Sequence, residues 1–231
     1  MRKDERGQGR AMVSPFPGRG FAAFLFDMDG TILSSIAAAE RVWASWARRH
    51  GLDVGAFLPT IHGRRSVETV RRLALPGVDP EAEAAAITLA EIEDVTGVAA
   101  IAGAPAFLAA LPAGRWAIVT SAPRALALRR LEAAGLPVPE VMITGEDVEH
   151  GKPAPDCFLL AADRLGVSAG ECLAFEDAAA GIAAAEAAGC AVVVITATHG
   201  HPLATRHFDA PGYEALSVSP GAAGSLILDA R

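Results

Sequence analysis

The fold of this chain of 231 residues is decided by residues 21–31, FAAFLFDMDGT. Phe21 to Phe26 is an unbroken apolar run, which is typical of a strand buried on both faces of a sheet. Asp27 and Asp29 follow directly, and Gly30 permits a sharp turn of the backbone. Side chains two residues apart on an extended backbone point the same way. The segment therefore predicts two carboxylates side by side at the end of a buried strand.

Similar apolar runs recur along the chain and alternate with helical stretches, each followed by a glycine of the kind that ends helices. Strands that alternate with helices of this length predict a parallel sheet with right-handed crossovers. The expected fold class is α/β, a Rossmann-like parallel sheet flanked by helices. The further strands are expected at 116–119, 141–143, 172–175 and 191–196, and the helices at 124–134, 155–165 and 178–188.

One region, residues 35–102, breaks the alternation because it carries helix-like patterns and no strand signal. An insertion after the first strand and its turn lies over the carboxyl end of the sheet, where open α/β folds bind ligands. We therefore interpret it as an all-helical cap domain. Its helical patterns cover 36–50, 67–75 and 82–93. The expected division is a flexible leader at 1–20, a catalytic core of 21–34 plus 103–231, and a cap of 35–102.

Composition narrows the class of protein. With 52% apolar and 20% charged residues, the chain has the composition of a folded protein. Its net charge of −7 argues against a nucleic-acid or membrane-surface binder, and no apolar run is long enough to span a bilayer. The three cysteines lack CxxC or metal-site spacing, which suits a reducing compartment. We expect a cytoplasmic protein, monomeric or weakly homodimeric.

The two aspartates at the first strand end suggest a specific chemistry. Like charges held this close are unfavourable unless they share a cation or a proton. Phosphoryl transfer meets both needs, because one carboxylate attacks phosphorus beside Mg²⁺ while the other carries a proton to the leaving oxygen. The alternative for Asp27 and Asp29 is a turn with solvated charges, which is less expected after a hydrophobic strand.

Polar residues also follow other expected strands at the same edge of the sheet. Thr120 and Ser121 offer hydroxyls to a phosphoryl oxygen, and Lys152 offers an ammonium to phosphate and nucleophile. Glu176 and Asp177 add acidic groups that are costly there unless they hold a divalent metal. Each segment alone has a simpler explanation as a turn, a solvated lysine or a helix cap. Four segments in order, each at a strand end, favour one site.

These segments resemble the four signature motifs of the haloacid dehalogenase superfamily, over about residues 21–200. The matching stretches are FDMDGT at 26–31, VTS at 119–121, GKPAPD at 151–156 and FEDA at 175–178. The dehalogenases that name the superfamily lack the second aspartate of the first motif, whereas its phosphotransferases use it. The resemblance therefore implies phosphoryl transfer.

The resemblance also implies a role for each motif residue. Asp27 is the nucleophile, and Asp29 is the general acid/base. Thr120 and Lys152 hold the transferring phosphoryl group, with Ser121 near it. The implied cofactor is Mg²⁺, with a metal site made of Asp27, the backbone carbonyl of Asp29, Asp177 and its neighbour Glu176.

A narrower resemblance is to the branch with a helical cap, and within it to sugar-phosphate, glycerol-phosphate and 2-deoxyglucose-6-phosphate phosphatases. One departure is Ser34, where many relatives have an aspartate, in the hinge that leads into the cap. The stretches that carry the narrower resemblance are ERVW at 40–43, HGRR at 62–65, RWAIVTS at 115–121 and ATH at 197–199.

The cap is expected to recognise the part of the substrate beyond the phosphate. His62, Gly63, Arg64 and Arg65 are candidates for hydroxyl or anion contacts. The alternative for the arginines is simple solvation.

Two residues of the first cap helix, Glu40 and Trp43, are three apart and share a face, so they are candidates for the pocket roof. The alternative for Trp43 is helix packing together with Trp46. We interpret His199 and His201 as loop residues near the site and not as metal ligands.

The sequence thus predicts a Mg²⁺-dependent phosphomonoesterase that hydrolyses a small sugar or polyol phosphate through an aspartyl-phosphate intermediate. One alternative is a sugar-phosphate mutase of the β-phosphoglucomutase type, which shares the four motifs and the cap. Another is a non-catalytic binding protein on the same fold. That reading predicts the loss of Asp27, Lys152 or Asp177, and all three are present.

Overall fold

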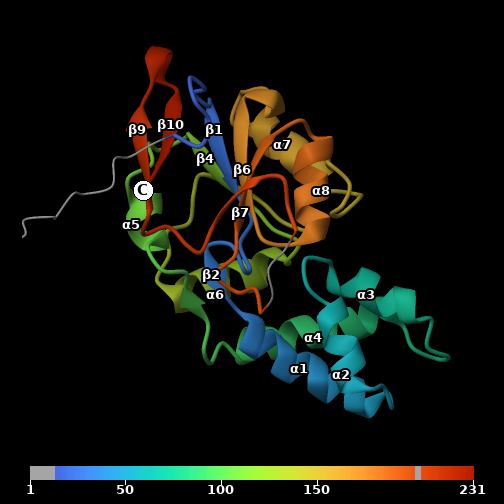
Figure 1. Cartoon of the computed structure of the whole chain (residues 1–231). Coiled ribbons are helices and arrows are strands. Elements are labelled where there is room, and N and C mark those ends of the chain that lie inside the picture. Colours follow the sequence, from blue (N-terminus) through green and yellow to red (C-terminus); the bar gives the residue numbers. More distant parts are fainter. Residues whose placement is uncertain (1–13, 201–203) are drawn as a thin grey trace, which may run out of the picture.

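The computed structural model describes residues 14–200 and 204–231, and its centre is a six-stranded parallel sheet. The strand order β5-β4-β1-β6-β7-β8 puts β1 between β4 and β6 (Figure 1). The predicted α/β class is confirmed. The strands are β1 Ala23–Phe26, β4 Trp116–Val119, β5 Val141–Ile143, β6 Cys172–Glu176, β7 Ala191–Ile195 and β8 Phe208–Ala210.

Helices cover both faces of this sheet, because every residue of β1, β4 and β6 is buried and both faces need an apolar partner. On one face, Phe24, Phe26 and Phe175 pack with Phe107 of α5. On the other, Leu25 and its neighbours pack against α7 and α8. These elements are α5 Ala104–Ala109, α6 Arg124–Ala134, α7 Asp156–Arg164, α8 Ala179–Ala187 and the short turn η2 Ala169–Glu171.

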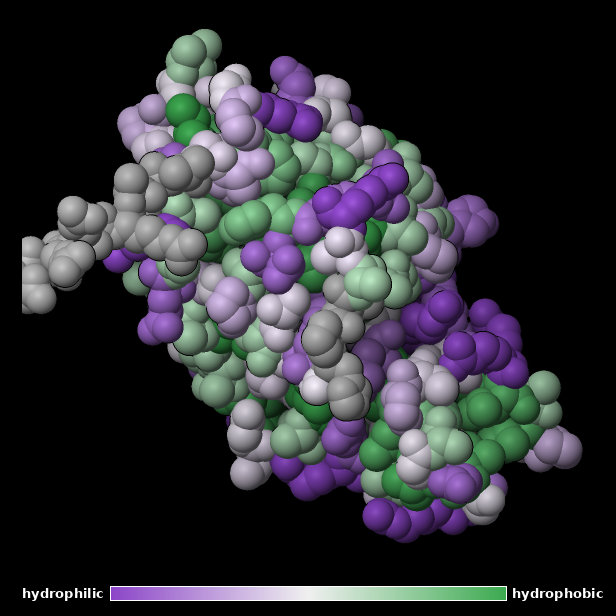
Figure 2. All heavy atoms as spheres, in the orientation of Figure 1, coloured by the Kyte–Doolittle hydropathy of each residue, from purple (hydrophilic) through white to green (hydrophobic). Residues whose placement is uncertain are grey.

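The insertion, residues 35–102, forms a second helical group below the strand ends in Figure 1. Its own core contains Trp43, Trp46 and Phe57, with ring centroids 5.6–5.7 Å apart. Figure 2 shows hydrophobic residues over this group, on a face where hydrophilic and hydrophobic residues are otherwise mixed. Its helices are α1 Ile36–Arg49, α2 Val54–Phe57, η1 Leu58–Thr60, α3 Ser66–Leu73 and α4 Pro80–Glu93.

The two chain segments that join the insertion to the core form a short antiparallel pair, β2 Leu33–Ser34 and β3 Ala99–Ala100. The expectation of no strand between 35 and 102 was therefore wrong. Two alanines are too short a segment to show the alternating pattern of a strand. β3 is recognised only by its pairing with β2. Gly103 at the exit has φ +80°, and a Cβ there would lie 2.6 Å from the backbone nitrogen of Glu214. Only glycine fits that close approach.

Sequence patterns missed the last strands of the chain. These are β8 at the sheet edge and a hairpin of β9 Leu216–Pro220 and β10 Leu226–Ala230, with η3 Ala222–Gly224 between them. The predicted leader at 1–20 lies largely outside the described residues, but two residues of its described part contact the core. Phe16 contacts Phe21 at 5.2 Å between ring centroids, and the Arg19 guanidinium donates to the carbonyl of Gly170 at 2.9 Å. None of the described helices has the length and apolar character to cross a membrane.

Candidate active site

The parallel sheet brings the predicted motif residues to one edge. Asp27 follows the central strand β1, Thr120 follows β4, and Glu176 ends β6. Lys152 comes from the loop between β5 and α7. Because parallel strands end at the same side, four segments far apart in the sequence meet around Asp27.

Lys152 is the central contact of the site. Its side chain is 2% exposed, and its ammonium donates to Asp27 Oδ1 at 2.6 Å, Glu176 Oε1 at 2.6 Å and the carbonyl of Val119 at 3.0 Å. Burial lowers the pKa of Lys152, but the charges of Asp27 and Glu176 outweigh burial and raise it overall. The lysine therefore stays a fixed cation beside Asp27.

The carboxylates around this lysine carry more negative charge than one cation balances. Burial raises the pKa of Asp27 to about 8, against the lowering effect of Lys152 and with a further increase from Glu176. The pKa of Asp177 is raised well above its usual value by burial, by Asp27 and by Glu176. Such a cluster favours either protons or a second cation.

The donors fit a hard divalent cation. Carboxylate oxygens of Asp27, Glu176 and Asp177 all lie within 4.8 Å of one another, and oxygen ligands suit Mg²⁺. Gly30 makes room for this arrangement, since a Cβ there would lie 2.0 Å from Asp177 Oδ2. Thr31 Oγ1 donates to the other oxygen, Oδ1, at 3.4 Å.

Glu176 uses both carboxylate oxygens within the protein. Oε1 accepts from Lys152, and Oε2 accepts from the backbone N–H groups of Asp177 at 2.9 Å and Ala178 at 3.0 Å. These contacts orient the lysine. They leave Asp27 and Asp177 as the carboxylates with oxygens available to a cation.

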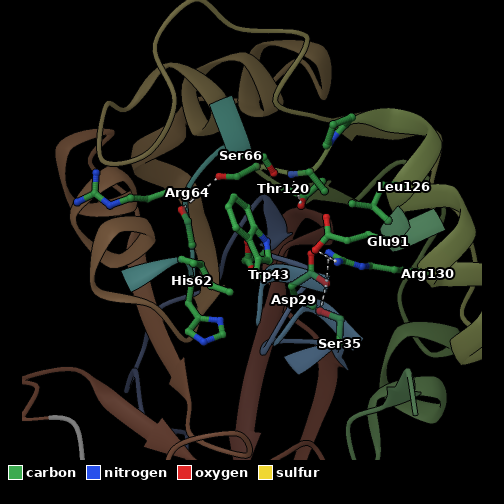
Figure 3. Close-up of a pocket in the computed structure, with 17 residues that line it drawn as sticks. Asp29, Ser35, Trp43, His62, Arg64, Ser66, Glu91, Thr120, Leu126 and Arg130 are labelled. Atoms are coloured by element: carbon green, nitrogen blue, oxygen red, sulfur yellow. Dashed lines mark hydrogen bonds and ion pairs between the residues drawn. The ribbon is translucent and has the colours of Figure 1, made fainter. Parts of the chain in front are cut away.

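Asp29 is held by two residues that the sequence analysis did not single out. Its Oδ1 accepts from the hydroxyl of Ser35 at 2.6 Å and from Arg130 of α6 at 3.0 Å. The same guanidinium donates to Glu91 of α4 at 3.1 Å (Figure 3). One weak feature of the sequence could have identified Arg130 as a site residue. It comes four residues after Leu126 and so lies on the buried face of its helix, where a charged residue is unusual.

Glu91 and Arg130 are both buried, at 5% and 6% exposure. Burial raises the pKa of Glu91 to about 7, an effect larger than the opposing one of Arg130. A buried ion pair of this kind joins the insertion to the core beside Asp29.

A pocket of about 80 Å³ lies between the insertion and the core (Figure 3). The motif residues Asp27, Asp29, Thr120 and Ser121 line it from the core. From the insertion it is lined by Ala39, Trp43, Ile61, His62, Gly63, Arg64, Ser66 and Glu91.

The pocket does not include every residue proposed for it. Glu40 lines a neighbouring groove instead, together with His199, and His62 Nε2 lies 3.7 Å from the carboxylate of Glu40. The spacing of Glu40 and Trp43 predicted that both would line one pocket. In the structure they line different cavities. His199 Nε2 lies 2.9 Å from the carbonyl of Asp177, next to the carboxylate cluster and outside it. His201 lies outside the described residues.

The two motif hydroxyls are already oriented. Thr120 Oγ1 accepts from the N–H of Ala122 at 3.1 Å, which leaves its own proton available to a ligand. Ser121 Oγ donates to the carbonyl of Gly63 at 3.3 Å and so links the core to the insertion.

Arg65, expected to contact substrate, instead binds the core loop that precedes Lys152. Its guanidinium donates to the carbonyls of Val148 at 3.3 Å and Glu149 at 2.9 Å, and it pairs with Glu68 of α3, the helix that begins at the next residue. The pocket is not lined by Arg65. In this arrangement the residue fastens the insertion to the core.

This contact leads to a first prediction, with Arg64 as the matched control. We expect Arg65→Ala to lower the free energy of unfolding by about 1–3 kcal/mol, because the partly buried carbonyl of Val148 and the carbonyl of Glu149 lose a charged donor. Arg64 is exposed, so Arg64→Ala should change it by less than about 0.5 kcal/mol. Urea unfolding of both variants measures the difference, and equal stabilities would contradict the fastening role.

Comparisons with known proteins agree with this geometry. The family model for haloacid dehalogenase-like hydrolases matches residues 21–189, well over half of the chain. Hexitol phosphatase A of Escherichia coli is 43% identical over 183 residues, covering 78% of this chain and 85% of the relative. The 2-deoxyglucose-6-phosphate phosphatase 2 of Saccharomyces cerevisiae is 34% identical, covering 76% of this chain and 80% of the relative.

A solved structure shows the same fold. A hydrolase from Pseudomonas syringae has a TM-score of 0.68 at 25% identity, over 83% of this chain and 94% of that one. Sequence family, relatives and fold therefore agree, and the chain belongs to the haloacid dehalogenase-like hydrolases.

Proposed function

We propose that this protein is a Mg²⁺-dependent phosphomonoesterase that hydrolyses a small sugar or polyol phosphate through an aspartyl-phosphate intermediate on Asp27. The observation that carries the proposal is the placement of Asp27 and Asp29 in one pocket, with Lys152 fixed against Asp27. The phosphatase names of the hexitol and deoxyglucose phosphate relatives support the substrate class.

In the first step a carboxylate oxygen of Asp27 attacks phosphorus, and the bond to the leaving oxygen breaks. Lys152 holds Oδ1 of Asp27, which fixes the orientation of the carboxylate. The hydroxyl of Thr120 donates its available proton to a phosphoryl oxygen. Both contacts place positive charge or a donor where negative charge collects.

Asp29 moves the protons. It protonates the leaving oxygen in the first step, and in the second it takes a proton from the water that hydrolyses the acyl phosphate on Asp27. Ser35 and Arg130 hold its Oδ1, so the other carboxylate oxygen carries the proton. The insertion over the pocket limits bulk water during both steps.

Asp27, Asp177 and the backbone carbonyl of Asp29 would hold Mg²⁺, while Glu176 orients Lys152. When bound, Mg²⁺ supplies positive charge that offsets the charge on the phosphoryl oxygens and allows Asp27 and Asp177 to be ionised together.

A second prediction follows for the metal and pH. The folded pKa of Asp27, about 8, is above its unfolded value. Without a divalent cation, the stability that this group contributes is therefore present below about pH 4 and lost as pH rises towards 8. Because Mg²⁺ competes with those protons, we expect it to raise the unfolding temperature more at pH 8 than at pH 6.

Thermal unfolding with and without Mg²⁺ at the two pH values measures this effect. The control is Asp177→Asn, which removes one proposed ligand and should greatly reduce the shift. An equal shift at both pH values, or the same shift in the variant, would count against this cation site.

The function itself is tested by phosphate release from sorbitol 6-phosphate, glycerol 1-phosphate and 2-deoxyglucose 6-phosphate, with Mg²⁺ or with a chelator. We expect Mg²⁺-dependent release from at least one of them. No release from any monophosphate would refute the proposed activity, and interconversion of hexose phosphates that needs a bisphosphate would indicate a mutase.

A further inference from the structure

The buried part of the pocket is short of positive charge for a substrate. Arg130 is a buried cation among the described residues that line it, and its guanidinium already donates to both Asp29 and Glu91. One arginine between two carboxylates leaves this side of the pocket without an excess cation. Glu91, one of these two carboxylates, carries no positive charge whether it is ionised or protonated.

The other lining cations lie at the pocket mouth. Arg64 is exposed, and in Figure 3 its guanidinium points away from Asp29. His62 is also exposed and lies 3.7 Å from the carboxylate of Glu40. Neither lies on the side of the pocket where Arg130 meets Glu91.

The proposed mechanism places the leaving group on that same side. Asp29 must contact the leaving oxygen to protonate it. Asp29, Glu91 and Trp43 line the same pocket (Figure 3). A leaving group that contacts the free carboxylate oxygen of Asp29 therefore has Glu91 and the indole of Trp43 as neighbours. A carboxyl group there can accept hydrogen bonds from substrate hydroxyls.

We propose that Glu91 is a specificity-determining residue that selects an uncharged, hydroxylated leaving group and rejects one that carries a carboxylate or a second phosphate. The proposal rests on the proposed phosphatase function and adds a residue to it. Hydroxyls gain a hydrogen-bond partner, whereas a second anion meets the carboxyl group of Glu91, and the buried cation beside it, Arg130, is already paired with Asp29 and Glu91. A mutase that works through a bisphosphate would need a cation that balances the second phosphate.

The test compares two substrates of matched size, glycerol 1-phosphate and 3-phosphoglycerate, which differ in a hydroxymethyl or carboxylate group. We expect the wild-type kcat/KM to favour glycerol 1-phosphate. Glu91→Gln keeps the shape and removes the charge, so the ratio of the two kcat/KM values should fall by about tenfold to a hundredfold. The change should come mainly from a lower KM for 3-phosphoglycerate.

Glu93→Gln is the matched control, because Glu93 is exposed on the same helix and lines the groove on the other side of α4. It should leave the ratio unchanged. Glu91→Asp keeps the charge and should keep the rejection of 3-phosphoglycerate. If Glu91→Gln fails to fold by circular dichroism, the wild-type preference and Glu91→Asp still test the proposal.

The two possible failures are distinct. Wild-type enzyme that prefers 3-phosphoglycerate, or a folded Glu91→Gln variant with an unchanged ratio, would overturn the role of Glu91 while the phosphatase activity stands. Wild-type enzyme that releases phosphate from neither substrate nor from sorbitol 6-phosphate would overturn the proposed function itself.

Discussion

Asp27→Asn is expected to lower kcat for phosphate release by about 10⁴-fold or more, because an amide does not attack phosphorus and no covalent intermediate forms. The fold should survive. Lys152 keeps its contacts to Glu176 and to the carbonyl of Val119, and the buried site loses one of its excess negative charges. Steady-state phosphate release and circular dichroism measure the two effects.

A matched control is Asp209→Asn on β8, where the aspartate is exposed and far from the motif residues in the sequence. It should keep full activity. Rapid quenching followed by intact-mass measurement should find a phosphorylated protein in the wild type and none in Asp27→Asn. An Asp27→Asn enzyme with substantial turnover would rule out the covalent route.

Lys152→Met is expected to have the largest effect on stability, about 3–5 kcal/mol, since it removes a buried cation from between carboxylates. It should also abolish activity. The loss of stability should be greatest near pH 8 and smaller near pH 5, because Asp27 and Asp177 have raised pKa values and become neutral as pH falls. Denaturant unfolding in the absence of Mg²⁺ at both pH values measures this.

The double variant Lys152→Met with Glu176→Gln separates charge from packing. Removing the second charge should recover part of the stability, because fewer unbalanced carboxylates remain buried. The two single variants each lower the free energy of unfolding by some amount. If the double variant lowers it by the sum of those amounts, the lysine acts through packing, and the electrostatic account of the site is wrong.

The sequence alone predicted most strands of the sheet and the motif residues. Buried parallel strands leave continuous apolar runs, and the predicted runs at 116–119 and 141–143 coincide with β4 and β5. The helix predicted at 124–134 coincides with α6. The late strand β8 and the hairpin were missed because short, partly exposed strands lack such a run.

Predictions for the insertion were less accurate. Glu40 and Trp43 share a helix face by spacing, yet they line different cavities. Arg65, a candidate for substrate contact, binds backbone carbonyls of the core and does not line the pocket. A charged side chain on a surface helix can reach several partners, and periodicity does not choose among them.

The sequence by itself determined the strands of the sheet other than β8, the family, and the placement of Asp27, Asp29, Thr120, Lys152 and Asp177 at one edge of the sheet. The physical reason is that parallel strands all end at the same edge. Only the tertiary structure decided that Glu176 orients the lysine and that Arg130 joins Asp29 to Glu91. The first contact depends on how a loop of the core folds over a strand end, and the second on how the insertion lies against the core. Many weak contacts set both placements, and no local pattern records them.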